Sequence, residues 1–244
     1  MGDLGGIQFL GNKVRMEGSE FDEWYGYVSE GLFQTQEDVT NSPVLNSSVR
    51  PGDVKYRDIS GPNGVPDGKI SPEYDRVLLG GSMPRYLYGG NIKLNYHNFD
   101  FGIVIQGVGK QDYRMEGLMV QPLPENWGHV PKIIDGNYWS TYNTPEQNLG
   151  VRYPRLSRTS DANNMAMSDY WIIDGGYFRL KNISLGYTIP SAVMDKVGIR
   201  SVRVYGNASD ILTINDYPKG WDPEVALSGY PITASYVLGA TIQF

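Results

Sequence analysis

Two-residue alternation between apolar and polar side chains is the pattern that most limits how this 244-residue chain can fold. In the segment 85–109, every second residue is apolar on both sides of a short turn near Asn98, and the residues between them are mostly polar. These apolar residues are Tyr86, Tyr88, Ile92, Leu94 and Tyr96 before the turn and Phe99, Phe101, Ile103 and Ile105 after it. Because successive side chains of a strand point to opposite faces, the pattern predicts a hairpin with one apolar face. Each arm has about ten residues, whereas strands of globular proteins usually have about five or six.

Three later segments repeat this alternation, and we expect strands at 177–189, 201–209 and 232–244. A sixth strand at 23–33 is a weaker expectation, because its sequence, which begins EWYGYV, alternates little. The composition includes 30 Gly, 15 Pro and 18 Tyr, which favours strands and turns over helices. The sequence therefore predicts an all-β fold of five or six long antiparallel strands.

The connections between these strands differ sharply in length. Those at 97–99 and 190–200 are short, whereas 34–84, 110–176 and 210–230 are long and polar. Long connections are uncommon in compact domains unless they are functional, and short turns facing long loops are typical of transmembrane β-barrels. We expect 50–84 and 110–176 to be extracellular loops. A soluble antiparallel sandwich with a ligand-binding rim is the alternative, because its strands also alternate.

Charge and residue content exclude several classes of function. The net charge is −6, so no basic surface for nucleic acid is expected. Cys is absent, which removes disulfides and thiolate nucleophiles. The first residues lack the basic and apolar regions of a signal peptide, and no run of 18 apolar residues predicts a membrane helix. A membrane role would therefore depend on strands.

A series of motifs gives the sequence a family resemblance. Residues 51–58 (PGDVKYRD), 67–70 (DGKI) and 75–80 (DRVLLG) resemble a segment of SusC/RagA-type TonB-dependent outer-membrane transporters. Further motifs follow in the order usual for that family: 106–109 (QGVG), 153–156 (YPRL), 168–171 (SDYW), 177–190 (YFRLKNISLGYTIP) and 220–224 (GWDPE). The resemblance covers roughly residues 17–244.

The resemblance implies that residues 1–244 are the C-terminal segment of a large barrel in the bacterial outer membrane. Such transporters also have a signal peptide, a TonB-contacting segment, a plug and about twenty-two barrel strands, which do not fit in this chain. Five or six strands cannot close that barrel, and lipid does not tolerate an open sheet edge, so the remaining strands would be needed as partners. The resemblance further implies import of oligosaccharides or oligopeptides, energy from TonB through the plug, and a SusD-like surface lipoprotein as lid.

A barrel wall assigns the two strand faces to lipid and lumen. Lipid-facing side chains would include Tyr86, Ile92, Ile103, Leu185 and Leu238. The polar residues expected to face the lumen are Asn91, Lys93, Asn95, Gln106, Arg203 and Asn207. The last strand carries Tyr236 and Phe244 and resembles the signal read by the barrel-assembly machinery.

Aromatic residues in the long loops have three interpretations. They are Trp127, Trp139, Tyr142, Trp171 and Trp221. Aromatic rings beside polar groups suit a sugar or peptide substrate. They could equally pack the loops together, or, by the family resemblance, contact the lipoprotein lid.

The acidic part of the 50–84 loop suggests a Ca²⁺ site formed by Asp58, Asn63, Asp67 and Asp75, because Ca²⁺ prefers oxygen ligands. The spacing does not match an EF-hand, and the alternative is a solvated loop of Asx-turns. We expect no organic cofactor.

We expect no catalytic residues. His97 and His129 have no Ser- or Cys-centred nucleophile motif as a partner, and the sequence gives no separation between the carboxyl groups of Asp222 and Glu224. The rival functions are a soluble secreted carbohydrate-binding β-sandwich, with or without Ca²⁺, and a β-fold glycan hydrolase.

Overall fold

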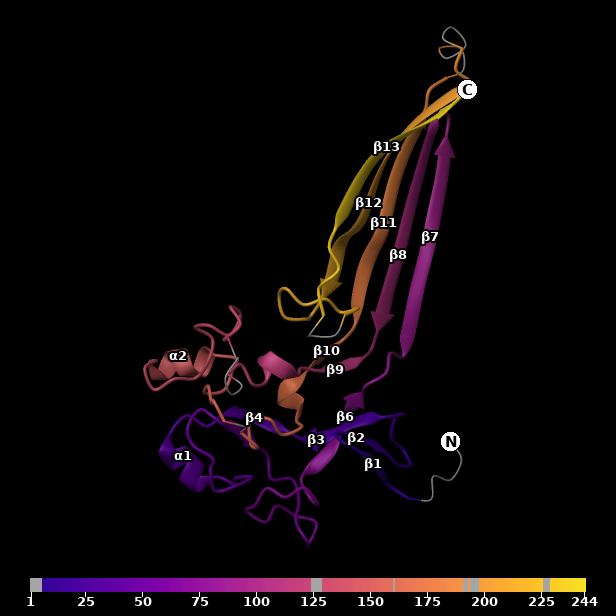
Figure 1. The fold of residues 1–244 in the computed structure, drawn as a ribbon. Helices are drawn as coiled ribbons and strands as arrows, with labels where there is room; N and C mark the ends of the chain where they lie inside the picture. The colour runs from indigo at the N-terminus through magenta and orange to yellow at the C-terminus, as the bar shows by residue number, and fades with distance from the viewer. Residues whose placement is uncertain (1–5, 124–128, 160, 191–192, 194–197, 226–228) are drawn as a thin grey trace. The chain divides into compact units, whose positions relative to one another are not determined.

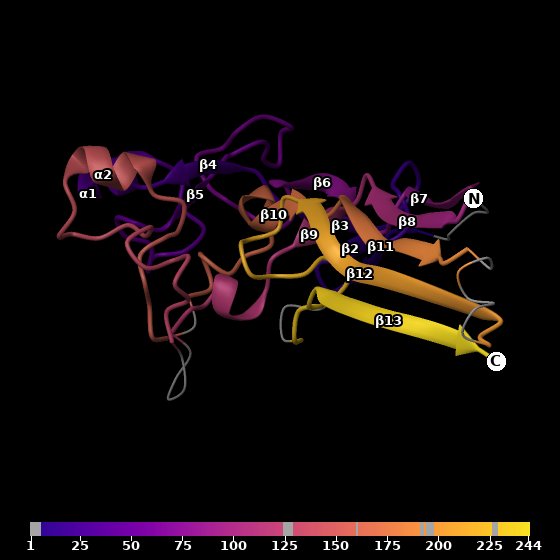
Figure 2. The same cartoon turned by 90° about the horizontal axis from the view of Figure 1, so that it is seen from above.

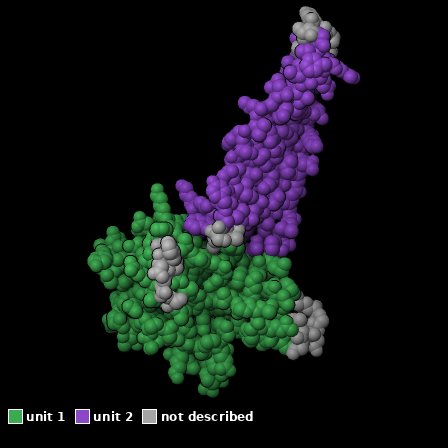
Figure 3. Space-filling view, viewed as in Figure 1, with its two compact units in different colours: residues 1–83, 112–173 green, residues 84–111, 174–244 purple. Residues whose placement is uncertain are grey.

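The computed structural model describes residues 6–123, 129–159, 161–190, 193, 198–225 and 229–244. The chain divides into two compact units, which are coloured separately in Figure 3. Unit 1 comprises Met1–Met83 and Asp112–Ile173, and unit 2 comprises Pro84–Gln111 and Asp174–Phe244. Within the described part of the chain, no helix combines the length and apolarity needed to cross a membrane.

Unit 2 is one antiparallel sheet of five long strands in the order β13-β12-β11-β8-β7 (Figure 1). The strands are β7 (Tyr86–Tyr96), β8 (Phe99–Gly109), β11 (Tyr177–Thr188), β12 (Ser201–Asn215) and β13 (Ser235–Gln243). The hairpin and the three later strands expected from the alternation are thus confirmed. Figure 2 shows β13 at one edge of this sheet, beside β12.

The register aligns apolar residues across the sheet. Ile92 pairs with Ile103, which pairs with Ile183 on its other side. The row continues through Ala208 to Tyr236 on the last strand. A parallel row ends at Leu238, whose side chain is 89% exposed. One face of the sheet is therefore an open apolar surface, which water does not favour.

A bulge explains why β12 is longer than expected. The pairing of β11 with β12 shifts between Leu180 and Asn182, and Asp210 on the partner strand has a φ of 54°. Asp tolerates this left-handed conformation better than most residues. The alternation is broken at this point, although the strand continues to Asn215.

The short and long connections lie at opposite ends of the strands. Residues 97–98 and 189–200 join neighbouring strands at one end. At the other end, 110–176 leads from β8 to β11 and 216–234 leads from β12 to β13.

Unit 1 contains short strands and single-turn helices. Its largest sheet has the order β1-β2-β3-β6, with β1 at Gln8–Leu10, β2 at Lys13–Arg15, β3 at Glu23–Tyr27 and β6 at Arg76–Gly81. Two pairs are β4 (Ser29–Leu32) with β5 (Val54–Tyr56), and β9 (Asp112–Arg114) with β10 (Ile172–Asp174). The helices are α1 (Gln36–Asn41), α2 (Pro145–Gly150) and the 3₁₀ turns η1 (Gly117–Met119) and η2 (Asp169–Trp171).

The expected sixth strand at 23–33 is corrected by this arrangement. It consists of two short strands, β3 and β4, that belong to two different sheets of unit 1. Gly26 in β3 lies so close to the Met167 backbone that an added Cβ would be 2.2 Å from its carbonyl oxygen. This contact requires a glycine, and the long sheet of unit 2 has five strands.

Candidate functional site

The polar face of the unit 2 sheet is the first candidate site. The register places the expected lumen-facing residues on one face: Asn91, Lys93 and Asn95 on β7, Gln106 on β8, and Arg203 and Asn207 on β12. This is the face opposite the Ile92–Ile103–Ile183 row. The six residues therefore lie on one face of the sheet. That this face lines a lumen stays a prediction.

An ion pair crosses the middle strand of this face. Arg203 on β12 donates from Nε and Nη2 to the two carboxylate oxygens of Asp100 on β8, at 2.8 and 2.5 Å. Gly186 on β11 lies beneath the pair, and an added Cβ would be 2.4 Å from Asp100 Oδ1. The absence of a side chain at Gly186 thus allows a two-pronged contact, the stronger form of an Arg–carboxylate pair, to span three strands.

A second, deeper cluster of charges lies at the long-loop end of the same face. The residues after β12, 216–225, which we call the strap, supply Asp222 and Glu224. Arg179 on β11 is only 1% exposed. Its Nη2 is 2.8 Å from Asp222 Oδ2, and its Nη1 is 3.0 Å from Glu224 Oε1. The Nε group donates to the hydroxyl of Thr213, so Arg179 joins the strap to two strands.

Lys181 extends this cluster through the bulge. Its Nζ is 2.9 Å from Asp210 Oδ1 and 3.4 Å from Glu224 Oε2. Lys181 lies at the point where the register shifts, opposite the left-handed Asp210. Bulges commonly redirect side chains in this way, and here the bulge allows Lys181 and Asp210 to meet beside Arg179.

Asp222 also holds the strap in its own conformation. Its side chain accepts hydrogen bonds from the backbone N–H groups of Glu224, at 2.9 Å, and Ile232, at 3.2 Å. Burial by itself would raise the pKa of Asp222, but the hydrogen bonds from Glu224 N–H and Arg179 outweigh it and lower that pKa. Asp222 is thus held as a carboxylate at the junction of the strap and the sheet.

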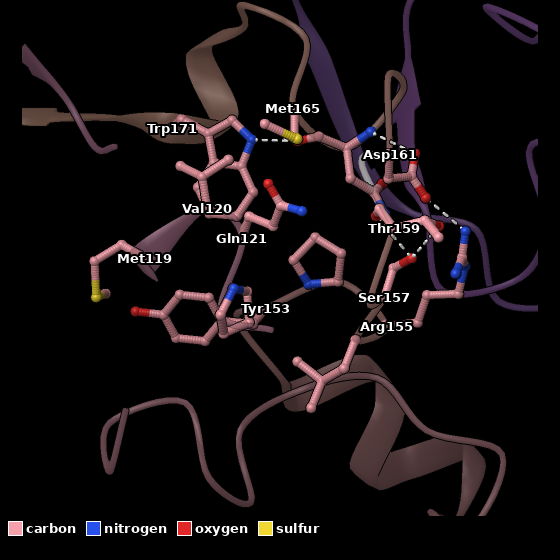
Figure 4. Close-up of a pocket in the computed structure, with 14 residues that line it drawn as sticks. Met119, Val120, Gln121, Tyr153, Arg155, Ser157, Thr159, Asp161, Met165 and Trp171 are labelled. Atoms are coloured by element: carbon pink, nitrogen blue, oxygen red, sulfur yellow. Dashed lines mark hydrogen bonds and ion pairs between the residues drawn. The ribbon is translucent and has the colours of Figure 1, made fainter. Parts of the chain in front are cut away.

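Unit 1 is organised around a different buried ion pair. Asp53 is fully buried, and its Oδ1 lies 2.6 Å from Arg155 Nε. Arg155 also reaches Asp161, and Asn164 donates to Asp53 at 2.8 Å. Burial raises the pKa of Asp53 despite these partners. Figure 4 shows Arg155 and Asp161 on one side of a small cavity whose other side includes Tyr153 and Trp171.

Two of the predicted contact aromatics pack the loops of unit 1 together. Trp171 is fully buried and donates its indole N–H to the Asn164 carbonyl at 2.6 Å. Trp139 is also buried and lies against Gly52, where an added Cβ would be 2.4 Å from the ring. These positions favour the packing interpretation for both residues, because neither ring has a broad open face.

The other aromatics differ. Tyr142 is 98% exposed, Trp221 on the strap is partly buried, and Trp127 lies outside the described residues. Tyr142 lies between Thr141 and Asn143, which line an open and mostly apolar groove of unit 1. Other lining residues of this groove are Gln34, Arg50, Pro51, Trp139 and Leu149.

The acidic loop uses its carboxylates on its own backbone. Asp75 is fully buried and accepts hydrogen bonds from the N–H groups of Ile59, Ser60 and Ser71. Burial opposes the charge, but these hydrogen bonds lower the pKa of Asp75.

Of the remaining candidate ligands, Asp58 is half-buried, whereas Asn63 and Asp67 are exposed. Asp58 accepts from Gly68 N–H at 2.6 Å, Asp67 accepts from Lys69 N–H at 3.0 Å, and Asn63 is exposed. No group of three or more His, Asp or Glu side chains suited to a metal occurs among the residues that the structure describes. Ca²⁺ binding stays a prediction.

The predicted assembly signal lies at the exposed edge of the sheet. Tyr236 on β13 and the terminal Phe244 are exposed, and Tyr236 shares the apolar face with Ala208. Recognition of this edge by an assembly machinery stays a prediction.

Comparison with known proteins gives one consistent family. No protein-family model matches the chain. TonB-dependent receptor P3 of Formosa agariphila is 31% identical over 250 aligned positions, covering 95% of this chain and 23% of that protein. TonB-dependent receptor SusC of Bacteroides thetaiotaomicron is 24% identical over 227, covering 90% of this chain and 20% of SusC.

Solved structures agree on the fold. The RagAB peptide transporter matches with a TM-score of 0.67 at 17% identity, covering 98% of this chain and 24% of that one. The open-open state of the RagAB peptide importer gives 0.66. The chain thus spans about a quarter of the length of the proteins it matches. Along nearly its whole length, the chain corresponds to the C-terminal part of a TonB-dependent receptor of the SusC/RagA type.

Proposed function

We propose that the chain forms part of the barrel wall and external loops of an outer-membrane importer that takes up oligosaccharides or oligopeptides. The observation that carries this proposal is the two-faced sheet of unit 2. Its strands are 9 to 15 residues long, and apolar residues line one open face while the opposite face holds charges. Transmembrane barrels require strands of this length with apolar-out and polar-in alternation.

The two edges of the sheet support partnership with further barrel strands. Within the described part of the chain, β7 and β13 each pair with one neighbour only. Unpaired backbone groups are costly in lipid, so we propose that the remaining strands of the barrel flank both edges. The plug, and TonB acting through it, belong to the same assembly.

The external loops supply the other proposed contacts. We propose that a SusD-like surface lipoprotein or the substrate meets the groove beside Tyr142, whose lining is largely apolar and includes Arg50. The names of the relatives support an importer in general, since they are TonB-dependent receptors and a peptide transporter. We propose no catalytic role for the chain.

Fractionation of the source cells tests the proposal. We expect the chain in the outer-membrane fraction, extracted only by detergent and accompanied by plug sequences and a surface lipoprotein in mass spectrometry. Recovery of the chain alone in the soluble fraction would contradict the proposal and would favour a secreted carbohydrate-binding protein.

A further inference from the structure

We propose that Arg179 is a positioning residue that fixes the strap, residues 216–225, on the polar face of the sheet. Under the proposed function, on which this step rests, the strap then becomes a fixed part of the substrate path at the external end of the barrel. The strap also carries Tyr217 and Trp221, which are both partly buried.

The strap lies against the polar face of the sheet, where it contacts Arg179. Arg179 pairs in register with Gln106 on one side and Thr213 on the other, so it belongs to the polar face. The apolar neighbours on the opposite face, Leu212 and Ile214, are exposed. Arg179 is nevertheless buried, and the groups that contact its guanidinium include Asp222 and Glu224 of the strap. The strap therefore covers the polar face at this end of the sheet.

The charges of the cluster depend on one another. Arg179 and Lys181 face three carboxylates, those of Asp210, Asp222 and Glu224. Removing one member of a buried ionic group is strongly unfavourable, because the charges that remain have no compensating partner. Without Arg179, Asp222 would lose the only cation that an ion pair assigns to it among the described residues.

Hydrogen bonds and two prolines restrict the conformation of the strap. The Asp222 side chain binds two backbone N–H groups, one in the strap and one at Ile232, where the chain returns toward β13. Tyr217 N–H donates to the Asn215 side chain, and Trp221 N–H donates to the Pro218 carbonyl. Pro218 and Pro223 restrict φ in the same segment. These contacts therefore restrict the conformation of the strap, and the contact with Arg179 fixes its position on the polar face of the sheet.

Spin labels can test this arrangement directly, because the chain contains no cysteine. Labels at Lys219→Cys in the strap and Asn91→Cys on the polar face, in the receptor purified in detergent, should give one narrow distance distribution. In an Arg179→Met background we expect that distribution to broaden or shift and the line shape at position 219 to show faster motion. Arg179→Lys, which retains the charge but not the forked geometry, should restore part of the wild-type signal.

Arg203→Met is the matched control. Arg203 also forms an ion pair on the polar face, but its partner is Asp100, and within the described residues it forms no ion pair with the strap. Its removal should leave the distance between positions 219 and 91 unchanged. An unchanged distance in Arg179→Met, or an equal disturbance in Arg203→Met, would overturn the assignment.

A second variant keeps the test informative if Arg179→Met does not fold. If Arg179→Met fails to fold, Asp222→Asn removes the charge that pairs with Arg179 Nη2 while it leaves Arg179 near Asp210 and Glu224, and it should also mobilise the strap. The spectroscopic result does not depend on transport. A soluble chain with a fixed strap would contradict the proposed function alone. A membrane-bound chain with a mobile strap would contradict the positioning role of Arg179 alone.

Discussion

The two units of this chain use apolar and polar residues in opposite ways. Unit 2 leaves its apolar side chains on an open face and pairs its buried charges on the other. Unit 1 buries aromatic residues such as Trp171 and joins its loops through buried polar groups such as Asp53 and Asn164. Strand pairing stabilises unit 2, whereas side-chain contacts between distant loops stabilise unit 1. The units should therefore respond differently to the same kind of substitution.

The largest effect should follow loss of the central ion pair of unit 1. Arg155→Met leaves Asp53 buried without a cation, and breaking a buried pair typically costs about 3–5 kcal/mol. We expect the loops 50–84 and 110–176 to become susceptible to limited proteolysis while the strands of unit 2 stay protected.

Arg57→Met is the control for that experiment. Arg57 pairs with Glu30 at 3.0 Å, but both side chains are largely exposed, so the cost should be about 0–1 kcal/mol. Equal protease sensitivity in the two variants would show that the buried pair has no special role.

A smaller effect is expected from filling a cross-strand contact in unit 2. Gly107 on β8 faces Tyr88 on β7, and an added Cβ would be 2.2 Å from the Tyr88 ring. Gly107→Ala should cost about 1–3 kcal/mol, the usual range for overpacking, measured as a lower urea midpoint for the barrel. Gly90→Ala is matched, because its Cβ would meet nothing closer than 3.8 Å. A larger loss in Gly90→Ala would contradict the register.

The pH response should separate two buried carboxyl groups of unit 1. Folding lowers the pKa of Asp75, so its contribution to stability is present above the ordinary value of 3.8 and is lost as pH falls through the lowered value. Folding raises the pKa of Asp53, so its contribution is present below 3.8 and is lost as pH rises through the raised value.

Protease protection of loop 50–84 can measure this difference. Asp75→Asn should remove the loss of protection that the wild type shows on acidification below 3.8. Asp53→Asn should leave that acid-dependent loss in place. An identical acid response in the wild type and in Asp75→Asn would contradict the assignment.

Calcium should have the smallest effect. Asp75 is occupied by backbone N–H groups and Asp58 is half-buried, which leaves Asp67 as the exposed carboxylate of the set, and few charged ligands give weak Ca²⁺ sites. We expect saturating Ca²⁺ to stabilise the loop by about 1 kcal/mol or less, and Asp67→Asn to abolish the effect. A strong stabilisation that a chelator reverses would contradict this expectation.

The alternation pattern predicts unit 2 far better than unit 1, for a physical reason. Alternation reports which face of a strand is apolar, so the pattern alone places Ile92, Ile103 and Leu185 on the apolar face of their strands. It says nothing about contacts between distant loops, such as the one between Trp171 and Asn164 or the close approach of Gly26 to Met167.

The charge cluster shows the same limit within unit 2. Arg179 and Asp222 both lie in motifs that carry the family resemblance, yet 43 positions separate them and no local pattern pairs them. The bulge at Asp210 that completes the cluster interrupts the alternation, which explains why the expected strand ended at 209.

Accessibility along β7 distinguishes a sheet with one face in lipid from a sheet that is solvated on both faces. Single spin labels would be placed at successive positions from Asn91 to Tyr96 in the receptor reconstituted into lipid, and this chain adds no competing cysteine. We expect labels at 92, 94 and 96 to collide with lipid-soluble oxygen and labels at 91, 93 and 95 to collide with a water-soluble nickel chelate. Uniform access to the water-soluble reagent at all six positions would contradict a lipid-facing sheet.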